Sequence, residues 1–300
     1  MLEHRNAIPL KPVRVVIIGA GGFVGGASAA MLEAQNIPTL RIGRDSVDLL
    51  TSDAIGKLIA LLKPDDALVV VSAIAPCKTV SMLSDNIRMM ESVCLALEKA
   101  PVAHVAYISS DAVYADDTNP LTEESRIQPD SLHGMMHAAR ELMLRSVVGD
   151  TPFAALRPSL LYGVDDPHNG YGPNQFRRRG QAGEDIVLFG EGEERRDHVL
   201  IDDVAAIILN VLLRRSAGAL NVATGSVASF RDIAELVAGH FEKPPRIVGR
   251  PRSGPMPHDG YRPFDIRACK AAFPDFRYTP LAEGIAVTHD RSKGQEIAGT

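Results

Sequence analysis

Residues 13–25 read VRVVIIGAGGFVG, an apolar run rich in β-branched residues that passes directly into three glycines spaced G-x-x-G-x-x-G. The apolar run predicts a buried strand, after which the chain must turn sharply to begin a helix. Gly19 allows the turn, Gly22 leaves room for a pyrophosphate at the positive end of the helix, and Gly25 lets the helix pack close to the strand. The stretch favours a dinucleotide-binding site over a purely structural turn.

Composition narrows the class of protein. The 300 residues are 45% hydrophobic and carry a net charge of -5, which is enough apolar material for one large or two modest domains and argues against a nucleic-acid partner. Cys77, Cys94 and Cys269 are too scattered for a disulfide framework or a zinc site, so we expect small core residues in a reducing compartment. Residues 1–12 contain no apolar leader, and the apolar run at 67–75 is too short to span a bilayer. A cytoplasmic protein with no membrane partner is expected.

Strands and helices are predicted to alternate along the first half of the chain. The strands cover 13–18, 38–43, 67–73, 102–109 and 153–157, and the helices cover 23–34, 52–62, 81–99 and 131–148. This alternation predicts an α/β fold, a Rossmann-type doubly wound parallel sheet covered on both faces.

The amino-acid composition of the chain changes after Pro158. Glycine, proline and charged residues crowd into 162–197, and the later predicted elements are shorter. We therefore expect residues 1–160 to form mainly a dinucleotide-binding domain. Residues 161–300 are expected to form mainly a smaller substrate-binding lobe, with some elements returning to the Rossmann core. The polar residues 289–300 are expected to fray.

Six short motifs follow one another along the chain: GAGGFVG at 19–25, DLL at 48–50, YISSDAVY at 107–114, LRPSLLYG at 156–163, ERRDHVLIDDVA at 194–205 and NVATG at 221–225. With these motifs in this order, nearly the whole chain resembles the extended short-chain dehydrogenases/reductases. That family includes the NAD-dependent epimerases and dehydratases of nucleotide-activated sugars.

The resemblance implies a set of cofactor contacts. Asp48 matches an aspartate near the adenine, and Ala73 and Ala75 match small residues that let the backbone approach the nicotinamide ribose. At the end of the second predicted strand, Arg44 suits a 2′-phosphate and favours NADP, while Asp45 keeps NAD as the alternative. The expected cofactor-binding residues are Gly19, Gly22, Phe23, Val24, Gly25, Arg44, Asp48, Ala73, Ala75 and His137.

Two residues after the strand at 102–109 match catalytic positions of the family. Ser110 matches the hydroxyl that hydrogen-bonds the reacting oxygen of the sugar. Asp111 lies where dehydratases and some reductases carry an acid. Ala112 stands where dehydratases usually place a glutamate, which counts against a standard dehydratase.

The chain departs from the family pattern at 133–137. The family carries Tyr-x-x-x-Lys here, with the tyrosine as acid/base and the lysine lowering its pKa, whereas this chain has His133 and His137 on the same helix face. Histidine exchanges protons near neutral pH, but a neutral imidazole lacks the fixed positive charge of lysine. Three interpretations stay open. His133 acts as a modified acid/base with His137 orienting it or the ribose, or redox chemistry is lost while binding is kept, or the pair binds zinc with an unidentified third ligand.

The second half of the chain supplies expected substrate contacts. Arg196 and Arg262 match arginines that the family aims at the substrate diphosphate, for which a planar guanidinium is suited. Asn174 and Phe176 lie where the family contacts the nucleotide and its base. Three aspartates are expected to order the loop and cap the next helix: Asp197, Asp202 and Asp203.

The resemblance implies an enzyme that binds NADP or NAD and a nucleotide-activated sugar. We expect reversible hydride transfer at a sugar carbon, giving epimerisation or carbonyl reduction, with Ser110, Asp111, His133 and His137 as the catalytic residues and no metal. The alternatives are a dinucleotide-binding or regulatory protein of the same fold and a nucleotide-sugar dehydratase. A homodimer through the helices at 81–99 and 131–148 is common in the family and is expected here.

Overall fold

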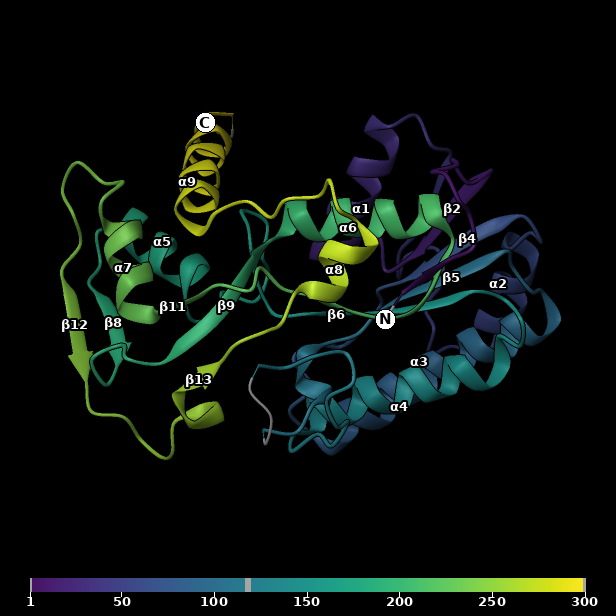
Figure 1. Ribbon diagram of the computed structural model, residues 1–300, viewed down its shortest axis with the longest axis horizontal. Helices are drawn as coiled ribbons and strands as arrows, with labels where there is room; N and C mark the ends of the chain where they lie inside the picture. Colours follow the sequence, from purple (N-terminus) through teal and green to yellow (C-terminus); the bar gives the residue numbers. More distant parts are fainter. Residues whose placement is uncertain (1, 117–119, 299–300) are drawn as a thin grey trace.

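The structure is a computed structural model that describes residues 2–116 and 120–298 (Figure 1). A seven-stranded sheet forms its larger part, made of β1 (Glu3–His4), β2 (Arg14–Ile18), β3 (Thr39–Ile42), β4 (Asp66–Val70), β5 (His104–Ile108), β6 (Phe153–Pro158) and β10 (Ser216–Val222). The order is β1-β10-β6-β5-β4-β2-β3, in which β1 is antiparallel to β10 and the pairs from β10 to β3 are parallel. The predicted α/β fold with a doubly wound parallel sheet is confirmed.

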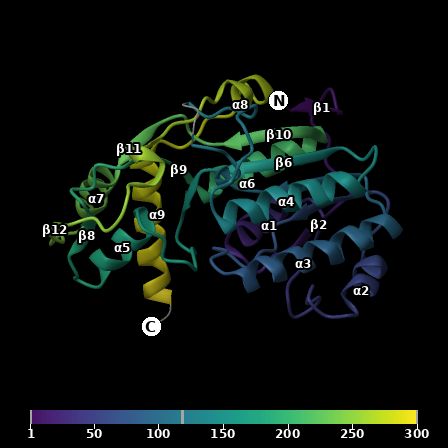
Figure 2. The same cartoon turned by 90° about the horizontal axis from the view of Figure 1, so that it is seen from below.

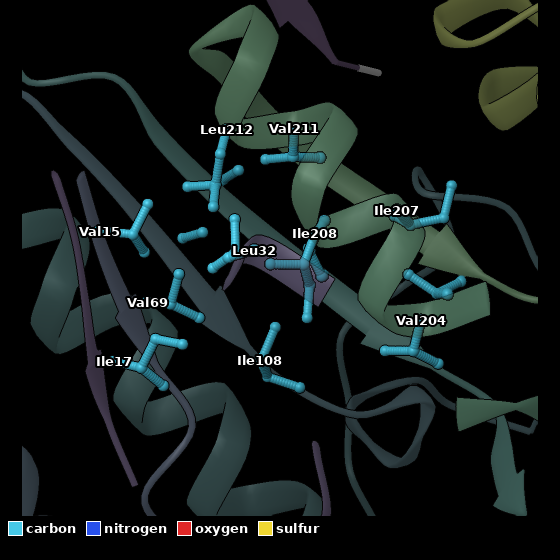
Figure 3. Close-up of a cluster of buried hydrophobic side chains, with 14 of the residues drawn as sticks. Val15, Ile17, Leu32, Val69, Ile108, Val204, Ile207, Ile208, Val211 and Leu212 are labelled. Atoms are coloured by element: carbon cyan, nitrogen blue, oxygen red, sulfur yellow. The ribbon is translucent and has the colours of Figure 1, made fainter. Parts of the chain in front are cut away.

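Helices cover both faces of this sheet (Figures 1 and 2). One face carries α1 (Phe23–Ala34) and α6 (Ile201–Arg214), and the other carries α2 (Ala54–Leu61), α3 (Val80–Lys99) and α4 (Leu132–Val147). Strand β2 shows why the sequence is apolar throughout: Val15 and Ile17 pack towards α1 and α6 (Figure 3), while Val16 and Ile18 pack towards α2 and α3. Successive side chains of a strand point to opposite faces, so a strand covered on both sides needs no polar residue.

The strand order places a topological switch point at β2. This strand pairs with β3 on one side and with β4 on the other, so the strand order reverses direction around it. In open parallel sheets, ligands bind outside the carboxyl ends of the strands at such a switch point. The glycine stretch follows β2 directly and therefore lies at this edge.

The second half of the chain builds a smaller lobe, which lies at the left of Figure 1. It contains a four-stranded sheet of β7 (Leu160–Tyr162), β9 (Arg195–Leu200), β11 (Val227–Ser229) and β13 (Tyr261–Arg262), a pair of β8 (Ile186–Phe189) and β12 (Ile247–Arg250), and helices α5 (Pro173–Gln181), α7 (Phe230–Ala238) and α9 (Leu281–Ala298). Phe176, Ile186, Leu188 and Phe230 form the centre of its own hydrophobic cluster. Helix α6 and strand β10 belong to the large sheet and its covering layer, and α8 (Arg267–Ala272) packs against β10.

The carboxyl-terminal helix corrects one prediction. Residues 289–298 continue α9 instead of fraying, because Thr288, His289 and Ser292 are 2–4% exposed and pack the helix onto the lobe. The polar composition hid this buried face. Throughout residues 2–116 and 120–298, no helix has the combined length and apolarity that crossing a membrane requires. The three cysteines are buried and free, as expected for core residues.

Candidate functional site

The glycine loop after β2 is shaped by close backbone contacts. Gly19 has a φ of +97°, and a Cβ there would lie 2.5 Å from the backbone nitrogen of Ser72. A Cβ on Gly25 would lie 2.2 Å from the carbonyl oxygen of Gly19. The Gly19 N–H also donates to the Ile42 carbonyl at 2.8 Å, which ties the loop to the end of β3. Both glycines are therefore required by geometry, as the sequence predicted.

The first turn of α1 suits an anion. Gly22 is the N-cap residue, and among the described residues no side chain caps the helix. The ring of half-buried Phe23 lies against Gly163, where a Cβ would stand 3.0 Å from Phe23 Cζ; Val24, beside it, is also half-buried. Uncapped amides at the positive end of a helix form an anion site, so the loop fits the pyrophosphate of a dinucleotide.

Arg44 and Asp48, both expected at the adenosine end of the cofactor, lie together just after β3. Arg44 Nε donates to Asp48 Oδ2 at 3.1 Å, and its side chain is 81% exposed. Asp48 Oδ1 accepts from the Leu50 N–H at 3.1 Å, and these two hydrogen bonds, the backbone one first, lower the pKa of the Asp48 carboxyl. An exposed ion pair of this kind is weak, so Arg44 is available to a ligand phosphate.

Ala73 and Ala75 lie in the loop after β4, which Asn86 of α3 holds in place. Asn86 is 0% exposed, accepts from the Ile74 N–H at 3.0 Å and donates to the Ile74 carbonyl at 3.0 Å. Both alanines are half-buried beside this anchored peptide. The loop is rigidly supported next to the glycine loop, since Ser72 touches Gly19.

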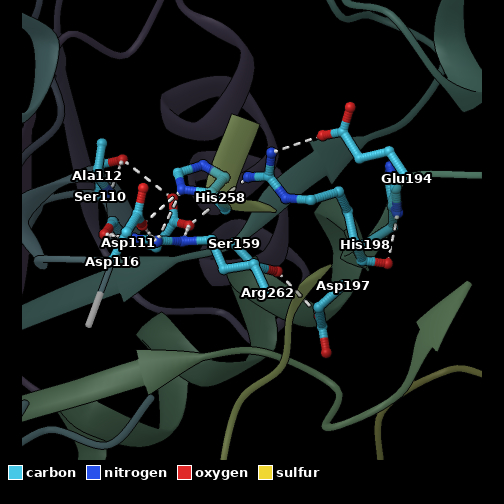
Figure 4. Close-up of polar contacts among 11 residues, drawn as sticks. Ser110, Asp111, Ala112, Asp116, Ser159, Glu194, Asp197, His198, His258 and Arg262 are labelled. Carbon is cyan, nitrogen blue, oxygen red and sulfur yellow. Dashed lines mark hydrogen bonds and ion pairs between the residues drawn. The ribbon is translucent and has the colours of Figure 1, made fainter. Parts of the chain in front are cut away.

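Ser110 and Asp111 follow β5 in a short 3-10 turn, η1 (Asp111–Val113). Ser110 Oγ caps this turn by accepting from the Ala112 N–H at 3.1 Å. The Asp111 carboxylate accepts from Arg262 Nε at 2.9 Å and lies 3.9 Å from Arg196 Nη2 (Figure 4). Strands β9 and β13 are paired so that Arg196 and Arg262 are in register. The structure thus brings together four predicted residues from three separate stretches of the chain.

Carboxylates and a histidine that the sequence did not single out complete this polar cluster. Arg262 also pairs with Asp116, which His258 Nδ1 contacts at 2.6 Å, and Glu194 Oε1 lies 3.4 Å from Arg196 Nη1. Burial lowers the pKa of His258, and the neighbouring arginines lower it further. Asp116 and His258 are 142 positions apart, so no local pattern could have paired them.

Asn174 is placed differently from the arginines. Its side chain is 3% exposed, accepts from the Gly163 N–H at 3.0 Å and donates to Asp166 Oδ2 at 2.9 Å. These bonds tie together the loop before α5. A substrate contact by Asn174 stays a prediction, and Phe176 is fully buried in the lobe core.

The three aspartates were only partly predicted. Asp197 accepts from the backbone N–H groups of Thr224, Gly225 and Ser226, so it orders the loop as expected. The expected helix caps are wrong, because Leu200 is the N-cap of α6. Two aspartates bind elsewhere instead: Asp202 pairs with Arg291, and Asp203 accepts from Thr279.

His133 and His137 lie one turn apart on α4 and face each other. Their ring centroids are 4.8 Å apart in an edge-on arrangement. His133 Nδ1 accepts from the Cys77 N–H at 3.4 Å, and His137 Nδ1 is 2.8 Å from the Tyr107 hydroxyl. Burial lowers the pKa of both imidazoles, that of His137 well below 6.5. Both rings are therefore neutral near pH 7.

A tight packing contact sets the histidine pair beside the β5 turn. A Cβ on Gly134 would lie 2.0 Å from the Ala112 carbonyl oxygen, so α4 begins directly against η1. The Asp111 charge acts on His133 and partly offsets the effect of burial on its pKa. Among the described residues, no group of three or more His, Cys, Asp or Glu side chains is arranged to hold a metal ion.

Glu141, one turn after His137 on the same face of α4, connects this helix to the end of β5 and to β6. Glu141 accepts from Ser109 Oγ at 2.6 Å and forms a two-pronged ion pair with Arg157, at 2.9 Å from Nε and 2.7 Å from Nη2. All three side chains are buried. The four-residue spacing of His133, His137 and Glu141 was the signal in the sequence that would have identified Glu141.

Two curated proteins are similar in sequence to this chain. Over 153 residues the chain is 31% identical to a dTDP-L-rhamnose 4-epimerase of Burkholderia thailandensis, a match that covers 48% of the chain and 40% of that protein. It is 24% identical to a dTDP-4-dehydro-6-deoxy-D-allose reductase of Streptomyces bikiniensis, covering 91% of the chain and 94% of the reductase.

A solved structure shows the same fold. A GDP-L-fucose synthetase from Naegleria fowleri bound to NADP superposes with a TM-score of 0.83 at 17% identity, covering 97% of this chain and 96% of that one. A sequence model of the NAD dependent epimerase/dehydratase family matches residues 15–223. The chain belongs to the NAD dependent epimerase/dehydratase family.

Proposed function

We propose that the protein is an NAD(P)-dependent epimerase or reductase that acts on a nucleotide-activated sugar. The observation that carries this proposal is the convergence of Ser110, Asp111 and His133 with the paired arginines of β9 and β13. Hydroxyl, carboxylate and imidazole groups supply hydrogen bonds and protons to a reacting oxygen, and guanidinium groups suit a diphosphate. The names of both curated relatives specify dTDP-linked sugars.

The cofactor of this proposal fits the residues present. The uncapped amides after Gly22 would hold the pyrophosphate, and Arg44 would pair with a 2′-phosphate, which favours NADP over NAD. When bound, the nicotinamide supplies or accepts a hydride at the sugar carbon. Ala73 and Ala75 leave the backbone accessible beside it.

Substrate binding requires the arginines to change partners. Arg196 and Arg262 now contact Asp111, and Arg262 also contacts Asp116. A diphosphate, like a carboxylate, offers a guanidinium two oxygens at once, and it would replace these carboxylates. Asp111 is then released next to the reacting oxygen, where it would share proton transfer.

His133 would donate to the reacting oxygen through Nε2. Because its Nδ1 accepts from the Cys77 N–H, the hydrogen of the neutral ring lies on Nε2. Ser110 would bind the same oxygen, and His137 would orient His133 or the ribose. A neutral imidazole donor is an established way to polarise a carbonyl oxygen.

A regulatory protein is the second candidate. It is favoured by one feature: burial lowers the pKa of both histidines that replace the tyrosine and lysine, which disfavours a fixed positive charge there. Such a protein would bind the dinucleotide without changing a sugar.

The outer face of α3 and α4 supports a homodimer within the same proposal. Leu95 is 39% exposed, Met135 48% and Leu142 67%, so apolar side chains of both helices face outwards. We keep a cytoplasmic location and the division into a dinucleotide-binding part at 1–160 and a substrate-binding part at 161–300 as further parts of the proposal.

Mass spectrometry of incubated sugar nucleotides tests the function. UDP-, GDP-, CDP- and dTDP-sugars, including 4-dehydro-6-deoxy sugars, would be incubated with the protein and NAD, NADH, NADP or NADPH. We expect a product of unchanged mass with a new retention time, which indicates an epimerase, or a gain of two hydrogens, which indicates a reductase. Loss of water would indicate a dehydratase. Cofactor binding without any product would overturn the enzymatic proposal in favour of the regulatory one.

A further inference from the structure

Arg140 is a buried cation whose polar neighbours are neutral. It lies on α4 one turn beyond His137 and is 0% exposed. Nη2 donates to the Ser72 carbonyl at 2.6 Å, and Nη1 lies 3.4 Å from Asn86 Oδ1 and 3.6 Å from Met136 Sδ. Nε is buried without a hydrogen-bond partner in the part of the chain that the structure describes. Burying a charge in this way is costly.

The neighbouring buried arginine shows the contrast. Arg157 is 2% exposed and is neutralised by the two-pronged ion pair with Glu141. Within residues 2–116 and 120–298, no carboxylate forms an ion pair with Arg140. Its positive charge thus has no ion-pair partner among these residues, and it lies in the core one turn beyond His137 on α4.

Tyr107 of β5 connects this charge to His137. The Arg140 guanidinium carbon lies 5.4 Å from the centroid of the Tyr107 ring, and the Tyr107 hydroxyl lies 2.8 Å from His137 Nδ1. Burial raises the pKa of Tyr107 to about 12, so the hydroxyl keeps its hydrogen. The side chain is only 1% exposed.

The donor of the hydrogen bond between Tyr107 and His137 follows from the acceptors that are available to each group. The Tyr107 hydroxyl makes a single hydrogen bond among the described residues, the one to His137. If His137 donated, the buried phenolic hydrogen would have no acceptor, which is costlier than an unfilled lone pair. Tyr107 therefore donates, His137 Nδ1 accepts, and the hydrogen of the neutral ring lies on Nε2.

We propose that Arg140 and Tyr107 are positioning residues that hold His137 as a neutral Nε2–H donor, so that the fixed positive charge behind the catalytic pair comes from residue 140. The titratable and charged groups acting on His137 are His133 and Arg140 on α4 and Tyr107 on β5. Burial contributes most to the lowered pKa of His137, the Arg140 charge disfavours protonation further, and the tyrosine fixes the tautomer. The role of His137 in catalysis rests on the proposed function, whereas its tautomer and charge do not depend on that function.

The ring state is measured by ¹⁵N NMR of histidine-labelled full-length protein, which distinguishes the two neutral tautomers and the cation. We expect His137 to remain a neutral Nε2–H ring between pH 8 and pH 5.5. Tyr107→Phe keeps the ring packing and removes only the hydroxyl, so the Nε2–H preference should be lost. The matched control is Tyr114→Phe, which removes an equally buried hydroxyl bonded to Asn221 and Arg157 and should leave His137 unchanged. A wild-type Nδ1–H tautomer, or no response to Tyr107→Phe, would overturn the proposal.

Replacing the charge is the second test. In Arg140→Met, His137 should take up its proton at a higher pH than in the wild type, because the repelling charge is gone. Arg140→Lys should restore most of the wild-type titration. Equal behaviour of the two variants would contradict the role of the charge. If Arg140→Met does not fold, Tyr107→Phe still decides. If the wild type turns over no sugar nucleotide, the proposed function fails while the ring-state result stands.

Discussion

The glycine loop and the face of α4 that carries His133, His137 and Arg140 meet at Ser72, but they are built in opposite ways. Ser72 lies against Gly19 through its backbone nitrogen and accepts from Arg140 through its carbonyl oxygen. The loop is defined by missing side chains, because a Cβ on Gly19 or Gly25 would collide with backbone. The face is defined by buried polar side chains whose partners come from other elements. The loop therefore depends on the absence of a Cβ, whereas the α4 face depends on hydrogen bonds and ion pairs with other elements.

Gly25→Ala tests the loop with the largest expected effect. The added methyl group would stand 2.2 Å from the Gly19 carbonyl oxygen, so the helix must move away from the strand. We expect a loss of about 3 kcal/mol in the free energy of unfolding and at least about tenfold weaker dinucleotide binding. Denaturant unfolding and cofactor titration measure both. Gly26→Ala is the control, since its Cβ would be 3.7 Å from the nearest atom; unchanged binding in both variants would remove the contrast between the two glycines.

His133→Ala tests the face through turnover. If Nε2 of His133 serves the reacting oxygen, kcat should fall about 100-fold, equivalent to about 2.7 kcal/mol, with little change in cofactor affinity. Met135→Ala, two residues on and 48% exposed, should leave kcat unchanged. Full turnover of His133→Ala in the sugar-nucleotide assay would show that the proton is handled elsewhere.

The same contrast explains how much could be predicted from sequence. The apolar run of β2 and the glycines after it specify strand, turn and helix locally, and the helix predicted at 23–34 coincides with α1. The histidines were identified because they stand, with the same four-residue spacing, where the family that the chain resembles carries Tyr-x-x-x-Lys. Tyr107 and Arg140 were missed because their meaning depends on contacts across 30 and 68 positions, and nothing local marks a buried guanidinium as unpaired. Arg140 falls three residues after His137, so helical spacing was the one available signal.

Buried imidazoles make stability depend on pH, whereas the glycine loop has no titratable side chain. His104, at the far end of β5 from the site, gives the scale: burial lowers its pKa from 6.5 to about 4. Its Nε2 bonds the Ser216 carbonyl, and its Nδ1 is buried without a partner among the described residues. The unfolded chain takes up this proton first, so stability is full above pH 6.5 and is lost as the pH falls towards 4.

His104 should therefore contribute a loss of about 2 kcal/mol between pH 7.5 and pH 5. The test is denaturant unfolding at both pH values. His104→Gln keeps a donor for Ser216 and should lose less stability on acidification by that amount; His137→Gln should act in the same direction. Identical losses in wild type and His104→Gln would mean that the folded protein protonates this histidine as readily as the unfolded chain does.

A substitution on the outer face of α4 has the smallest expected effect on stability. The inner face of α4 carries the half-buried His133 and the buried His137, while Leu142 on the outer face is 67% exposed. Exposed substitutions change the free energy of unfolding by less than about 0.5 kcal/mol, so Leu142→Lys should leave folding and cofactor binding intact. If α3 and α4 form the proposed dimer interface, however, two buried lysines facing each other across a twofold axis should separate the subunits. Analytical ultracentrifugation should then show a dimer for the wild type and a monomer for Leu142→Lys. The exposed Phe189, in the other lobe, provides the control: Phe189→Lys should remain a dimer. A dimer that survives Leu142→Lys would place the interface away from this face and leave α4 with one functional surface, the inner one.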